Sequence, residues 1–94
     1  MTFQTEFPDF PATDMPAIPA GWTDQSWRND SCPCFNTGNG ALVYVDFADT
    51  SLREIPDGTR FNVQADPEIH GHNETFLDTD IWDEVLFFVA NGCV

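Results

Sequence analysis

The C-terminal stretch from Leu77 to Gly92 constrains the fold most, because it combines helix-start residues, a helical period and a helix stop. Thr79 or Asp80 is expected to cap the helix, and the acidic pair that follows Trp82 places negative charge in its first turn, where the helix dipole favours it. The closing Asn-Gly pair is typical of a left-handed helix end. At helical spacing between these signals stand the apolar residues expected to face the core: Ile81, Trp82, Val85, Leu86, Phe88 and Val89.

Strand-like segments separated by turn sequences precede this helix. Residues 41–47 are the strongest, and their Leu-Val-Tyr-Val run is typical of a central strand that is apolar on both faces. Residues 59–65 alternate as a half-buried strand. The sequence therefore predicts an α+β fold, a small antiparallel sheet of three to four strands covered by one C-terminal helix. Weaker features are extended pieces at 32–35 and 75–77, an edge strand at 51–55, turns at 36–40 and 56–58, and a polar loop at 66–74.

The N-terminal residues 1–21 are rich in proline and contain three phenylalanines. Proline at this density disfavours a helix and favours extended or polyproline backbone. We predict an extended arm over residues 1–21 that packs on the body through some of its phenylalanines, and a single α+β domain over residues 22–94. Residues 22–27 are expected to form one helical turn that directs Trp22 and Trp27 towards the core.

The charge of the chain is strongly one-sided. Sixteen aspartates and glutamates face three arginines and no lysine, which gives a net charge of −13 over 94 residues. A hydrophobic share of 41% is enough for one compact domain, so the acidity does not indicate disorder. Bare nucleic acid and anionic membranes are excluded as direct partners, because both carry negative charge. Three explanations remain: a basic partner, adaptation to high salt, or genome composition.

The sequence contains no recognisable targeting or membrane-spanning segment. Its N-terminus lacks the basic and apolar regions of a signal peptide, and no apolar run is long enough to span a bilayer. Three cysteines, an odd number, favour reduced thiols over a disulfide framework. We therefore expect a cytoplasmic protein, in its own cell or in a host cell.

Two cysteines and two histidines are the residues with metal-binding chemistry. Cys32, Cys34, His70 and His72 supply two thiolates and two imidazoles, a ligand set found in tetrahedral zinc sites. The single residue between the two cysteines is shorter than the spacing usual in such sites, and successive strand positions point to opposite faces. The alternative is a pair of buried cysteines and a loop of solvated histidines. No nucleophile motif surrounds the cysteines, so we predict neither enzymatic activity nor a cofactor.

The acidic surface is the remaining functional feature. Carboxylates two residues apart on an extended chain, as at Asp78 and Asp80, lie about 6.6 Å apart when they share a face, close to two phosphate steps of about 3.4 Å. Such a surface is complementary to a basic protein surface and speeds encounter with it. The carboxylates expected to face water and contact the partner are Asp46, Asp49, Asp57, Asp66, Glu68, Glu74, Asp78, Asp80, Asp83 and Glu84.

In size, charge and expected location, the chain resembles phage-encoded nucleic-acid mimics, anti-CRISPR proteins among them. The resemblance implies a non-enzymatic inhibitor that binds a basic DNA- or RNA-handling surface, such as that of a CRISPR effector complex. It implies no particular fold, because anti-CRISPR proteins share none. The alternatives are a small zinc-stabilised binding module and an acidic domain of a salt-adapted organism. We expect a monomer, or a homodimer formed through the phenylalanines of the arm.

Overall fold

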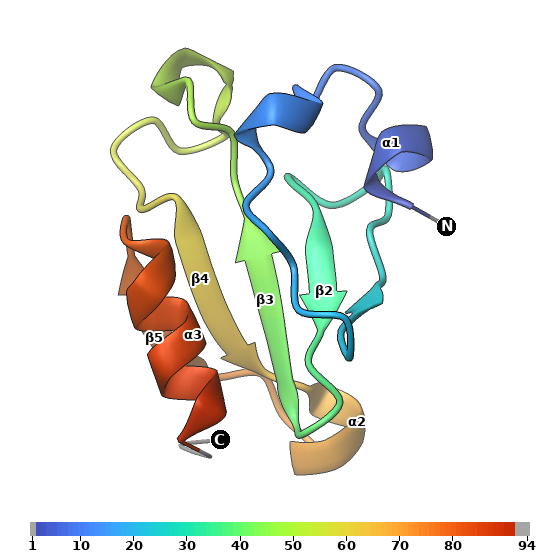
Figure 1. The fold of residues 1–94 in the computed structure, drawn as a ribbon, viewed down its shortest axis with the longest axis vertical. Helices are drawn as coiled ribbons and strands as arrows, with labels where there is room; N and C mark the ends of the chain where they lie inside the picture. The colour runs from blue at the N-terminus through green and yellow to red at the C-terminus, as the bar shows by residue number, and fades with distance from the viewer. Residues whose placement is uncertain (1, 92–94) are drawn as a thin grey trace.

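A computed structural model describes residues 2–91 as an α+β fold built on one antiparallel sheet (Figure 1). The predicted fold class is confirmed, whereas the predicted count of three to four strands is wrong. Five strands lie side by side in chain order: β1 (Thr23–Asp24), β2 (Cys34–Asn36), β3 (Ala41–Val45), β4 (Phe61–Ala65) and β5 (Thr75–Thr79).

The centre of the sheet follows from alternation along its two longest inner strands. On β3 the side chains at Leu42 and Tyr44 are only half-buried, so this strand has one buried face rather than the two that its sequence indicates. The β2–β3 hairpin turns through Gly38 and Gly40, whose φ angles of 83° and 99° favour glycine, as predicted for this loop. The buried face of β3 and β4 consists of Ala41, Val43, Val45, Phe61, Val63 and Ala65.

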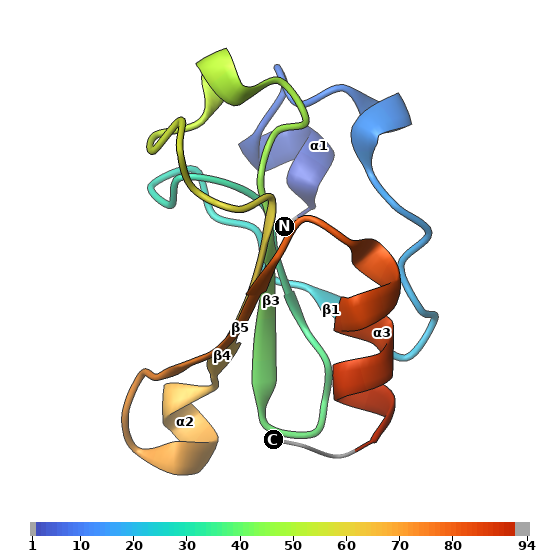
Figure 2. The same cartoon turned by 90° about the vertical axis from the view of Figure 1, so that its left-hand side faces the viewer.

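Helix α3 (Trp82–Ala90) packs across the buried face of the sheet (Figure 2). Val85 and Val89 enter the core, and the Trp82 ring centroid lies 5.1 Å from that of Phe61 on β4. The predicted helical cover is therefore confirmed. Ile81 differs from prediction: it is 54% exposed, because it is the N-cap of α3 and lies outside the inner face of the helix.

The helix begins later than the sequence predicts. Thr79 ends β5, and its hydroxyl accepts a hydrogen bond from Ile81 N at 3.1 Å and donates one to Glu84 at 2.6 Å. Asp80 accepts a hydrogen bond from the main-chain N of Arg60 at 2.8 Å. Thr79 thus pairs with Phe61 of β4 and the Asp80 side chain bonds Arg60, so neither of the two predicted caps is the N-cap of the helix.

The end of α3 also differs from the predicted Asn-Gly stop. Asn91 follows the helix with a φ of −90°, so it does not adopt the left-handed conformation. Gly92, the other residue of that stop, lies outside the described residues. Within the described part of the chain, no helix has the length and apolar character needed to cross a membrane.

The predicted extended arm is not present within residues 2–21. The short helix α1 (Phe3–Glu6) and the 3-10 helix η1 (Ala12–Asp14) occupy this segment. Thr2 and Thr5 form a capping box ahead of the first proline, and these local hydrogen bonds favour a helical turn despite the proline-rich sequence. Phe10 is buried at 5% exposure in the same core as β3 and α3.

Two loops contain short helices that aspartates cap. Asp49 caps the 3-10 helix η2 (Thr50–Leu52), and Asp66 caps α2 (Pro67–His70), each by accepting a main-chain hydrogen bond from two residues further on. Such local bonds compete with extended backbone. This competition explains why residues 51–55 form a 3-10 turn and bend rather than the predicted edge strand.

Residues 22–27 do not form the predicted helical turn; Thr23 and Asp24 within them form β1, which pairs with β2. The Asp24 carboxylate accepts hydrogen bonds from Phe3 N at 2.7 Å and Ser26 N at 3.0 Å, so it fixes β1 between the N-terminal segment and the sheet. Trp22 is partly buried against the core, but Trp27 is 50% exposed. A two-residue strand is too short to show a period, so its sequence gives no strand signal.

Candidate acidic interaction site

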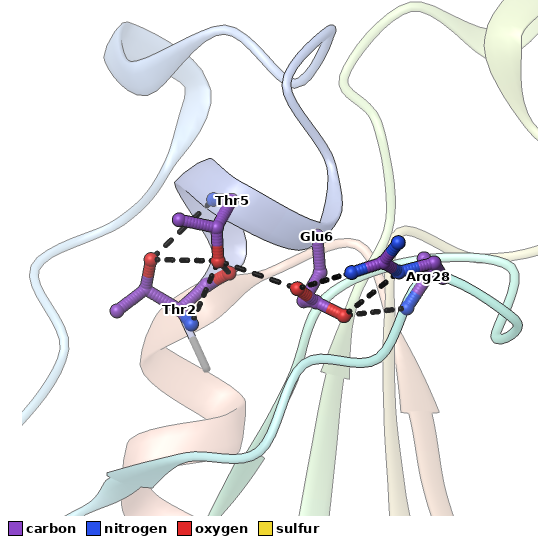
Figure 3. A network of polar contacts seen from close by, with 4 residues as sticks. All are labelled: Thr2, Thr5, Glu6 and Arg28. Carbon is purple, nitrogen blue, oxygen red and sulfur yellow. Dashed lines mark hydrogen bonds and ion pairs between the residues drawn. The ribbon is translucent and has the colours of Figure 1, made fainter.

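The arginines offset little of the negative charge. Among residues 2–91 the one ion pair joins Arg28 Nε to Glu6 Oε1 at 3.4 Å. Figure 3 shows Arg28 directed at this carboxylate on α1, beside the capping box of Thr2 and Thr5. The hydrogen bond from Arg28 holds the pKa of Glu6 below its ordinary value. The pair therefore ties α1 to the turn that follows β1.

The other two arginines bind main-chain oxygens. Arg53 donates to the carbonyls of Phe47 at 2.6 Å and Gly58 at 2.9 Å, which closes the β3–β4 connection on itself. Arg60 donates to the carbonyl of Asp14, at the end of η1. Within the described residues neither guanidinium forms an ion pair with a carboxylate. Most of the carboxylates therefore have no cationic partner among the described residues.

Six of the ten predicted partner-binding carboxylates hold the fold locally. Asp66 is 6% exposed, so the expectation that it faces water is wrong; its cap position directs it to Glu68 N at 3.0 Å and Asn36 Nδ2 at 3.1 Å. Asp46 is half-buried, and this burial raises its pKa. The six with internal hydrogen bonds are Asp46, Asp49, Asp66, Asp78, Asp80 and Glu84.

The other four predicted carboxylates have no such role. Each is exposed, and none makes a side-chain hydrogen bond or an ion pair with another described residue. Their charge is therefore available to a partner without loss of any contact in the fold. These four are Asp57, Glu68, Glu74 and Asp83.

The ten carboxylates form two groups at opposite ends of the sheet rather than one patch. The β3–β4 connection and the β5–α3 junction meet at one end, where Arg60 N bonds Asp80, while α2 lies at the other end (Figure 1). We call these the β3–β4 end and the α2 end. The α2 end holds Asp66, Glu68 and Glu74, and the β3–β4 end holds Asp46, Asp49, Asp57, Asp78, Asp80, Asp83 and Glu84.

The candidate zinc ligands do not come together. No group of three or more metal-ligating side chains forms among the described residues. Cys34 lies opposite Tyr44 in the β2–β3 ladder, whereas His70 ends α2 and its Nε2 lies 3.0 Å from the Gly40 carbonyl. Cys32 and Cys34 are buried, and burial raises the pKa of each thiol to about 12. Neither thiol is therefore activated as a nucleophile or poised as a thiolate ligand.

The sheet face opposite α3 carries a polar hollow that the sequence does not reveal. Its volume is about 320 Å³, and Tyr44, Asn62 and Asp78 from three adjacent strands line it. The amide of Asn62 donates to Asp78, while its Oδ1 atom is buried and accepts no hydrogen bond from a described residue. The one sequence signal is the polar half of the alternation on β4, which marks a face but not a hollow.

A second, apolar feature lies between α3 and the edge strand β5. Leu77 of β5 and the α3 residues Asp83, Glu84, Phe87 and Phe88 line a groove of about 380 Å³, here called the β5 groove. Phe87 is 71% exposed, the largest exposure among the large apolar side chains of the described chain. The helical period predicts the inner face of α3 but gives no reason for an exposed phenylalanine on its outer face.

Comparison with known protein families, curated proteins and solved structures finds no match to this chain. The function is therefore inferred from the surface chemistry of the molecule. That chemistry comprises an uncompensated negative charge, two acidic ends and an apolar groove beside one of them.

Proposed function

We propose that this protein is a non-enzymatic inhibitor whose acidic surface occupies a basic nucleic-acid-binding site of a partner protein, in the manner of anti-CRISPR DNA mimics. The observation that carries the proposal is the use of the three arginines. One pairs with Glu6 and two bind main-chain carbonyls, so fifteen of the sixteen carboxylates form no ion pair among the described residues, and a net charge of −13 remains. The proposed location is the cytoplasm, where CRISPR effector complexes act.

Charge of this size has a cost that a partner would remove. A small domain needs a net charge of magnitude about 2 to 8 for solubility, and excess like charge destabilises the compact state. A basic groove that binds phosphates supplies the missing positive charge. Complementary fields also speed encounter with the correct partner and repel acidic ones.

The arrangement of the carboxylates supports binding rather than catalysis. The exposed ones lie at the two ends of the sheet, on loops and helix starts held by local caps and by Arg53. A rigid body with acidic ends presents charges at fixed separations, as a stretch of nucleic-acid backbone does. The thiols of Cys32 and Cys34 are buried and their pKa is raised, so neither is an activated nucleophile.

Two double variants test which acidic end makes the contact. Asp57→Asn with Asp83→Asn removes two negative charges from the β3–β4 end, and Glu68→Gln with Glu74→Gln removes two from the α2 end. All four side chains are exposed and free of internal contacts, so both variants are expected to fold normally. The measurement is release of labelled DNA from a panel of CRISPR effector complexes. We expect one variant to weaken inhibition at least about tenfold; unchanged inhibition in both would contradict the proposal.

A further inference from the structure

Strand β5 forms an open edge of the sheet. It is last in the strand order, and among the described residues it pairs with β4 alone. The main-chain N–H and C=O groups on its other side are therefore available to a further strand. At the opposite side of the sheet the edge is β1, which is only two residues long and offers little to pair with.

The β5 groove lies beside this edge, on the α3 side of the sheet. A strand added to β5 would lie about 4.8 Å from it and would direct every second side chain towards that side. There Leu77, Phe87 and Phe88 present apolar surface to such a side chain. A single added strand would therefore pair with the open edge of β5 and also contact Phe87.

Carboxylates lie on both faces of the sheet beside the β5 edge. Asp83 and Glu84 line the groove itself, and Asp78 is exposed on β5. The occupant that fits is an extended segment with an apolar side chain for the groove and lysines or arginines on either side of it. A second copy fits poorly, because it would bring a further net charge of −13 and its own acidic edge to the same place.

We propose that β5 and its groove bind an extended basic segment of the partner protein by strand addition, with one apolar side chain of that segment packed against Phe87. This proposal rests on the proposed function, since it assigns the surface by which the inhibitor grips a basic partner. Main-chain hydrogen bonds along β5 would supply affinity, and the groove with its carboxylates would select the sequence.

A labelled synthetic peptide that alternates lysine with valine is the probe, and fluorescence anisotropy is the readout. We expect this peptide to bind, and peptides that alternate lysine with serine or glutamate with valine to bind at least about tenfold more weakly. Two further peptides carry N-methyl groups on alternate residues, one in each phase. Strand addition predicts that one phase loses binding; equal binding of both phases and the parent peptide would overturn it.

Matched variants of the protein locate the site. Phe87→Ser is expected to weaken binding of the lysine–valine peptide about tenfold. Ile69→Ser on α2, which removes a side chain with a similar exposure of 68%, is expected to leave it unchanged. Asp83→Asn and Glu68→Gln form a second such pair, the first in the groove and the second at the opposite, α2 end. Equal effects within either pair would overturn the assignment to the groove.

Sedimentation velocity separates a partner site from a self-association site. A dimer that Phe87→Ser converts to monomer would show that a second copy occupies the edge, and would overturn the proposal. Failure here is distinct from failure of the proposed function. Inhibition of DNA binding that survives Phe87→Ser would leave the acidic inhibitor intact and remove only the strand-addition site.

Discussion

At the scale of single residues, the fold uses its few cations and several of its anions for main-chain hydrogen bonds. Arg53 and Arg60 form no ion pair with a carboxylate among the described residues, but they close the β3–β4 connection and fix η1 to it. Asp49 and Asp66 cap short helices. A charge count from the sequence therefore overstates the number of carboxylates that are free of contacts within the fold. Only the structure separates Asp83, which is free, from the hydrogen-bonded Asp66.

The Glu6–Arg28 pair gives the stability a defined pH dependence. The pKa of Glu6 is lowered from an ordinary value of 4.5 by the hydrogen bond from Arg28. A lowered folded-state pKa means that the contact stabilises the fold above the ordinary value and is lost as pH falls through the lowered one. We expect Glu6→Gln to be less stable than the unmodified protein at neutral pH and equally stable in acid.

Urea unfolding of both proteins from neutral to acid pH checks this prediction. Asp57→Asn is the control, because Asp57 is exposed and has no internal contact. We expect the stability of this variant to change with pH in the same way as that of the unmodified protein. A gap between Glu6→Gln and the unmodified protein that stays constant across pH would show that the contact does not depend on ionised Glu6.

At the scale of elements, the inner side of α3 packs against the sheet and its outer side is exposed to solvent. Val85 is fully buried against the sheet, and Phe87 is 71% exposed. Val85→Ala is expected to lower the free energy of unfolding by about 2 kcal/mol, because it removes buried apolar surface and leaves a cavity. Phe87→Ala is expected to change it by less than about 0.5 kcal/mol. Urea unfolding measures both, and a larger loss for Phe87→Ala would mean that α3 is rotated from the described orientation.

The sequence predicts those elements whose apolar residues recur at the spacing of a strand or a helix. The alternation of residues 59–65 and the helical spacing of Val85, Phe88 and Val89 identify β4 and α3. In contrast, β1 exists through its pairing with β2, and α1 exists through the Thr2–Thr5 capping box. These features depend on two or three residues, which is too few for a pattern.

The candidate site is predictable to a similar extent. The sequence identifies most exposed carboxylates of the two acidic ends, although it misses Glu54 in the β3–β4 connection and wrongly includes the buried Asp66. Their division into two groups depends on strand order, which brings Asp57 and Asp83 to one end and Glu74 to the other. The β5 groove is missed, because the helical period only leaves Phe87 outside the core-facing residues and does not indicate that it borders a groove.

At the scale of the whole molecule, the uncompensated charge determines how the protein responds to salt. Repulsion between carboxylates weakens as salt screens it, so we expect the melting temperature to rise moderately with salt. If the charge serves a partner, the protein is expected to remain folded even in about 0.01 M salt. Thermal melts followed by circular dichroism test this. Unfolding in dilute buffer would instead support a fold adapted to high salt.

The most direct test of the proposed inhibitor is competition with DNA for a CRISPR effector complex at increasing salt. We predict that the protein displaces labelled DNA at low salt, does not bind the DNA itself, and loses affinity for the complex as salt rises from about 50 to about 200 mM. DNA that stays bound to every complex of the panel at the lowest salt, with the inhibitor in excess, would contradict the proposed function.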